Sequence, residues 1–132
     1  MQAAILRAKL PDLDNMLVDR RAQAARYSEG LAATGLDLPQ TLPGYGHAWR
    51  NYVIEADDRD GLANRLAQRG IATNLTYAPP MHLQPVFADY GISIGSFPVT
   101  ERAAVRLLGL PIGPQLAMEE IDEVISAIRA VA

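Results

Sequence analysis

The residues of this 132-residue chain that are best suited to chemistry lie between positions 77 and 101. Tyr77 and His82 flank the Pro79-Pro80 pair, in a predicted loop between a strand and a short helix, and such loops often carry functional side chains. An imidazole can donate, accept or exchange a proton near neutral pH. Two interpretations stay open from the residues alone: His82 lines a pocket, or it is a loop histidine that caps and packs locally.

Glu101 follows Phe97 by four residues, at the start of a predicted helix. A carboxylate in the first helical turn is stabilised by the partial positive charge there, and Arg102 or Arg106 is expected beside it. We therefore interpret Glu101 as a structural carboxylate and not as a catalytic one.

Lys9 is the only lysine, and a lysine amine is the group that forms Schiff bases with carbonyl compounds. It lies between Leu6 and Leu10 in an amphipathic pattern, so we expect it on a solvated helical face. Its neighbours provide no desolvated pocket that would activate the amine.

The remaining candidates for chemistry are weaker. His47 and His82 are 35 positions apart and the chain has no cysteine, so we assign no metal ligands. Gly44-Tyr45-Gly46 lacks the lysine and helix of a phosphate loop. Trp49 is interpreted as a packing anchor, and Arg50 either contacts an anionic ligand or is solvated or salt-bridged.

Composition bounds the class of protein. The net charge is −3, and the twelve basic residues are spread among acids, which argues against a nucleic-acid partner. No apolar run approaches the ~20 residues of a membrane span, and the N-terminus resembles neither a signal nor a transit peptide. We expect one domain over residues 1–132 in a cytoplasmic protein.

The hydrophobic pattern predicts the elements that position these residues. A long helix over residues 2–33 should kink or restart at Pro11, because proline lacks an amide proton and clashes with the preceding turn. Strands are expected over residues 50–56, 71–77 and 107–112. Helices are expected over residues 59–69, 85–90, 97–108 and 117–131. This order predicts an α+β fold with a small antiparallel sheet of about three strands, helices on one side and a long N-terminal helix.

The segment from Gly70 to Gly113 resembles the C-terminal domain of the DegT/DnrJ/StrS-type sugar aminotransferases, which are fold-type-I enzymes that use pyridoxal phosphate (PLP). Its matching marks are Gly70-Ile71, Tyr77, Pro80, His82, Phe97-Pro98 with Glu101, and Leu110-Pro111. The resemblance implies that Tyr77 and His82 help to form the substrate pocket. Thr76 stands where the family usually has histidine, so a titratable substrate contact is missing at that point.

The resemblance further implies transfer of an amino group onto a keto-sugar nucleotide by a homodimer whose active sites are built from both subunits. The family's Schiff-base lysine, glycine-rich phosphate segment and pyridine-binding aspartate precede the part that matches here. We therefore assign no catalytic and no cofactor-binding residue. We expect no PLP binding and no transamination by this chain alone, although the full-length family uses PLP.

A second hypothesis is a standalone binding or oligomerisation module that reuses the fold. Without a partner domain, the first helix would expose a stripe of leucines: Leu6, Leu10, Leu13 and Leu17. Such a stripe is usually buried by association. We expect a homodimer through this helix, or a missing N-terminal domain against it. A nucleotide-sugar is the ligand to consider for a pocket near Tyr77 and His82.

Overall fold

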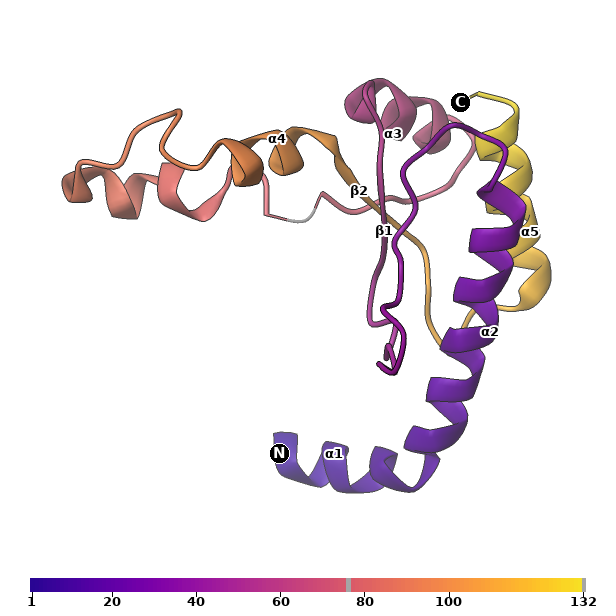
Figure 1. Ribbon diagram of the computed structural model, residues 1–132. Helices are drawn as coiled ribbons and strands as arrows, with labels where there is room; N and C mark the ends of the chain where they lie inside the picture. The colour runs from indigo at the N-terminus through magenta and orange to yellow at the C-terminus, as the bar shows by residue number, and fades with distance from the viewer. Residues whose placement is uncertain (76, 132) are drawn as a thin grey trace.

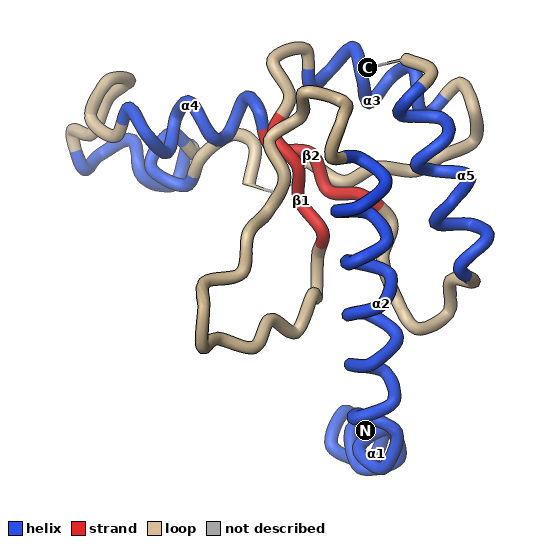
Figure 2. The backbone as a smooth tube through the Cα atoms, turned by 45° about the vertical axis from the view of Figure 1, so that its right-hand side comes forward, coloured by secondary structure: helices blue, strands red, loops and turns tan. Residues whose placement is uncertain are grey.

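The computed structural model describes residues 1–75 and 77–131. It consists of a packed body and an arm that projects from it (Figure 1). In the body, helices α2 and α5 lie side by side next to a short sheet, and the arm, which contains α4, points away from them (Figures 1 and 2). Among the described residues, no helix combines the length and hydrophobicity needed to cross a membrane.

The N-terminal helix is divided at the predicted position. Helix α1 (Gln2–Lys9) is followed by a 3₁₀ turn (Leu10–Asp12) that contains Pro11, and α2 (Leu13–Leu31) then runs in a new direction (Figure 1). The restart follows from the missing amide proton of proline. Helix α1 has no buried residue, whereas α2 buries its C-terminal half, including Ala24, Tyr27 and Leu31.

The sheet is smaller than the sequence pattern predicts. Strands β1 (Tyr52–Glu55) and β2 (Leu107–Leu110) pair antiparallel, with Tyr52 opposite Leu110 and Glu55 opposite Leu107. The prediction of a third strand over residues 71–77 is wrong for the described part of that segment. Only one isolated bridge joins Asn74 to Gly109, through hydrogen bonds of 2.9 and 2.8 Å. Alanine and asparagine at positions 72 and 74 disfavour a longer strand.

Two further helices complete the body. Helix α3 (Arg59–Ala67) is capped by the Asp58 carboxylate, which accepts from the Gly61 amide at 3.1 Å. Helix α5 (Met118–Arg129) buries Ile121, Val124, Ile125, Ala127 and Ile128. These side chains share one core with the C-terminal half of α2, with α3 and with both strands. The structure is therefore the expected α+β fold with a two-stranded sheet.

The arm comprises residues 77–106. It contains two 3₁₀ helices (Met81–Leu83 and Pro85–Tyr90) and helix α4 (Pro98–Arg106). Pro80 and Ala104 are its only buried residues. Eight large apolar side chains of the arm are exposed: Tyr77, Met81, Val86, Tyr90, Ile94, Phe97, Val99 and Val105. The arm is thus held in shape mainly by local contacts, and its apolar surface is open.

Candidate functional site

The carboxylate of Glu101 is the centre of a hydrogen-bond cluster in the arm. Its two oxygens accept from the Gly95 amide at 3.0 and 2.9 Å, and Oε1 also accepts from the Phe97 amide at 3.1 Å. His82 Nε2 lies 3.1 Å from the same Oε1. The cluster joins the 3₁₀ helix Met81–Leu83, the loop before α4 and the first turn of α4.

These contacts favour the charged carboxylate. The hydrogen bonds from Gly95 and Phe97, followed by the bond from His82, hold the pKa of Glu101 below its ordinary value. An ionised carboxylate has no proton to donate, so the His82 Nε2 must be the donor in their shared bond.

Of the two arginines expected beside Glu101, Arg106 lies elsewhere, so the prediction is wrong for that residue. Arg106 instead binds three acids near the sheet: Asp37 at 3.0 Å, Glu55 at 3.1 Å, and Asp57. Glu101 does lie in the first turn of α4, as predicted. Its partners are backbone amides and a histidine because the preceding loop folds back over the helix start.

His82 is largely enclosed. Its side chain is 9% exposed, and its ring meets Phe97 edge-on with ring centres 4.9 Å apart. The ring lines an open, mostly apolar hollow whose other members are Met81, Phe87, Tyr90, Ile92, Phe97 and Thr100. Both interpretations made from the sequence therefore describe part of its environment: His82 packs locally and also borders a hollow.

Tyr77 borders a neighbouring hollow and not the same one. Its hollow is lined by Pro80, Met81, Thr100, Ala103, Ala104 and Leu107, and Met81 and Thr100 are the residues common to both. Tyr77 has a positive φ of 58° and is 75% exposed. The structure thus brings Tyr77 and His82 to adjacent hollows, while position 76, which departs from the family pattern, lies outside the described residues.

The segment around Trp49 is a packing unit, as predicted. The Trp49 ring packs against His47 and against Tyr52, with ring centres 4.1 and 5.5 Å away. Arg20 donates to the carbonyls of Trp49 and Arg50 at 2.9 and 3.1 Å. The Arg50 side chain is exposed.

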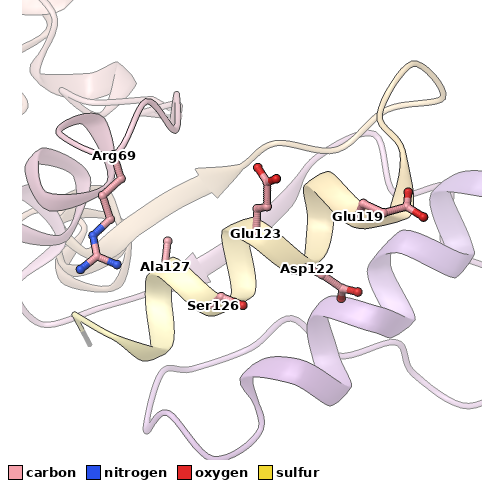
Figure 3. Close-up of a pocket in the computed structure, with 6 residues that line it drawn as sticks. All are labelled: Arg69, Glu119, Asp122, Glu123, Ser126 and Ala127. Carbon is pink, nitrogen blue, oxygen red and sulfur yellow. The ribbon is translucent and has the colours of Figure 1, made fainter.

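Lys9 and the acidic side chains beside α5 lie outside the arm. Lys9 is exposed on α1, as predicted. A shallow hollow beside α5 is lined by Arg69, Glu119, Asp122, Glu123, Ser126 and Ala127, and its carboxylates point in different directions (Figure 3). Within residues 1–75 and 77–131, no group of histidines and acids converges as metal ligands would.

Comparison with known proteins identifies relatives over nearly the whole chain. The profile of the DegT/DnrJ/EryC1/StrS aminotransferase family matches residues 1–129. The chain is 41% identical over 131 residues to the erythromycin biosynthesis sensory transduction protein EryC1 of Saccharopolyspora erythraea, covering 98% of this chain and 36% of that protein. It is also 41% identical over 130 residues to the dTDP-3-amino-3,4,6-trideoxy-alpha-D-glucose transaminase of Streptomyces venezuelae, covering 98% and 34%.

Solved structures agree with these matches. The backbone superposes on the crystal structure of S. venezuelae DesV in complex with a ketimine intermediate with a TM-score of 0.94 and 40% identity, over 98% of this chain and 35% of that one. A DegT DnrJ EryC1 StrS aminotransferase from Brucella abortus gives a TM-score of 0.88 at 36% identity, over 98% and 34%. The chain therefore spans about a third of the length of these relatives.

Proposed function

The chain belongs to the DegT/DnrJ/EryC1/StrS aminotransferase family, and we propose that residues 1–132 form the C-terminal domain of an enzyme that aminates a keto-sugar nucleotide. The observation that carries this proposal is the match to a dTDP-sugar transaminase at 41% identity over 130 residues. The TM-score of 0.94 to a related structure that holds a ketimine intermediate supports it. Function in such families depends on the site and not on the fold alone, so the residues must also fit.

The residues present do not fit PLP. A Schiff base needs a lysine beside a pocket, and Lys9 is exposed on a helix with no buried residue. We therefore propose that this segment supplies substrate contacts and that the cofactor is held by other parts of the enzyme. On this proposal, the 132 residues alone do not transaminate.

Tyr77 and His82 are the residues that we propose to contact the substrate. They border two hollows that share Met81 and Thr100, in an arm whose apolar side chains are exposed. A sugar ring has apolar C–H faces and hydroxyl edges, and a site of aromatic and apolar walls with a few polar groups suits it.

A second candidate function is a non-catalytic binding or oligomerisation module. The observation that favours it is the exposed apolar surface of α1 and the following turn, where Leu6 and Leu10 are 68% and 66% exposed. Surfaces of this kind mark association sites in soluble proteins. This candidate needs neither a lysine nor a sugar.

A chimera separates the two functions. The matched third of the S. venezuelae transaminase is replaced by this chain, and transamination of its dTDP-sugar is measured with the native relative as the control. We expect a folded chimera that binds PLP and transaminates. A folded, PLP-loaded chimera without activity would favour the module.

The chain by itself provides the complementary test. It is mixed with PLP, treated with borohydride and digested for mass spectrometry. We expect no reduced PLP adduct above the level found in a Lys9→Gln variant. A stoichiometric adduct at Lys9 would refute the proposal that these residues alone cannot hold the cofactor.

A further inference from the structure

The feature that the proposed function leaves unexplained is the pairing of His82 with Glu101. A histidine that only filled space would not need a carboxylate partner, and a first-turn carboxylate could stay in solvent. Here both side chains are largely enclosed, at 9% and 17% exposed, and their bond measures 3.1 Å.

Glu101 is itself fixed before it reaches His82. The amides of Gly95 and Phe97 occupy its two oxygens, so the carboxylate cannot rotate without losing these bonds. The edge-on contact with Phe97 restrains the imidazole from a second direction. The position and the orientation of the ring are therefore both determined by groups of the arm.

In a neutral imidazole, the pairing also determines which ring nitrogen carries the proton. When Nε2 of a neutral imidazole donates to a carboxylate, Nδ1 keeps its lone pair and acts as an acceptor. Nδ1 makes no hydrogen bond with any residue in the described ranges, and the ring borders the apolar hollow formed with Met81, Phe87 and Phe97.

We propose that Glu101 is a positioning residue that holds His82 as the Nε2–H tautomer, so that Nδ1 accepts a hydrogen bond from a hydroxyl group of the sugar. The role of the sugar rests on the proposed function, whereas the tautomer can be tested without it. Glu101 acts through His82 and does not itself touch the substrate.

The first experiment reads the tautomer directly by long-range ¹H–¹⁵N NMR of the chain at neutral pH. His47 is the internal reference, because its Nδ1 accepts from the Trp49 amide at 2.8 Å in the loop before β1. We expect His82 as the Nε2–H tautomer in the wild type and a mixture of tautomers in Glu101→Gln and Glu101→Ala. Asp89→Asn, which removes an exposed charge from the same arm, should leave the His82 signals unchanged.

A wild-type His82 that carries its proton on Nδ1 would overturn the proposal. So would an unchanged Nε2–H tautomer in both Glu101 variants with His47 at its wild-type position, which would show a folded protein in which Glu101 has no such role. Because an Nδ1–H signal in the wild type would overturn the proposal by itself, unfolding of a variant does not remove the test.

The second experiment uses the chimera with the S. venezuelae transaminase. We expect Glu101→Gln to raise the KM for the dTDP-sugar roughly 3- to 10-fold with a smaller change in kcat, because one hydrogen bond to bound substrate is weakened. Asp89→Asn should change neither. An unchanged KM together with an altered tautomer would overturn the contact with the sugar, while an inactive chimera would count against the proposed function and leave the NMR result standing.

Discussion

At the scale of single residues, Gln23 holds the loop before α5 against α2. Its side-chain amide donates to the carbonyls of Gly113 and Leu116 at 2.9 Å each, and its oxygen accepts from the Gly113 amide at 3.0 Å. The residue is 3% exposed, so these backbone groups have little access to water. Gln23 is therefore a buried polar residue whose capacity for hydrogen bonds is used by one loop.

We expect Gln23→Ala to lower the free energy of unfolding by roughly 2–4 kcal/mol, because buried backbone groups lose their partners. Urea unfolding followed by circular dichroism measures it. The matched control is Gln40→Ala in an exposed loop, which should stay within about 0.5 kcal/mol of the wild type. Equal effects of the two substitutions would contradict this account.

Glu101 also predicts a pH dependence of the arm. The pKa of Glu101 is lower in the folded state than its ordinary value of 4.5, with the Gly95 amide as the largest cause. Its stabilising contribution is therefore complete above that ordinary value and is lost as the pH falls through the folded-state pKa.

The amides of Gly95 and Phe97 report this loss through hydrogen exchange. After correction for intrinsic rates, we expect their protection to fall as the pH is lowered from ~6 to ~3 in the wild type. Glu101→Gln should show weaker protection at the higher pH and a flatter pH profile. A profile as steep in this variant as in the wild type would assign the dependence to other groups.

The sequence placed Tyr77, His82 and Glu101 in one stretch of the chain, but it did not describe their contacts. The resemblance that marked them lies in one continuous segment, most of which forms the arm. It did not reveal that Gly95 and His82 both bind Glu101, since His82 lies 19 positions before the carboxylate and the path of the intervening loop decides the distance. Gly95, with a φ of +93°, was the available sign of a sharp turn there.

At the scale of elements, α2 and α5 approach closely at Gly30. A Cβ atom at this position would lie 2.6 Å from Ile125 Cδ1 and 2.8 Å from its Cγ2. An alanine normally stabilises a helix relative to glycine by about 1 kcal/mol. The packing at Gly30 predicts instead that an alanine at this position destabilises the protein.

We expect Gly30→Ala to destabilise the protein by about 1–3 kcal/mol through overpacking. Thermal and urea unfolding measure the change. The control is Gly46→Ala, which we expect to be nearly neutral, because an added Cβ there would meet no atom within 4 Å beyond its chain neighbours. The cost should shrink in an Ile125→Val background, which removes the nearest atom. A stabilised Gly30→Ala protein would show that the helices can separate without loss.

The helices were predictable from the sequence and the sheet only partly. Pro11 divides a helix through its missing amide proton, Asp58 caps one with its side-chain carboxylate, and Gly70 follows one with a positive φ of 78°. Each effect depends on a single residue type and can be predicted from the local sequence. The segment around Asn74 was misjudged because its pairing with Gly109 depends on a strand 35 positions away. Tertiary contacts of that kind override local strand propensity.

At the scale of the whole molecule, the chain presents unburied apolar surfaces on α1 and on the arm. Leu6, Leu10 and Leu13 are 68%, 66% and 45% exposed along α1 and the following turns, at helical spacing. We propose that a second copy covers this leucine surface when the chain is isolated. In a two-fold dimer each leucine occurs once on each subunit, so one substitution changes the interface at two places.

Sedimentation velocity over a range of concentrations tests the dimer. We expect a concentration-dependent dimer for the wild type, and at least about a tenfold higher dissociation constant for Leu6→Gln with Leu10→Gln, because removing apolar burial of this size costs more than ~1.4 kcal/mol. Val86→Gln with Ile94→Gln, which changes exposed side chains of the arm at 73% and 80% exposure, is the matched control and should dimerise as the wild type does. Loss of the dimer in the arm variant alone would place the interface on the arm. A monomer at every concentration would contradict self-association, and the leucine surface would then require a different partner.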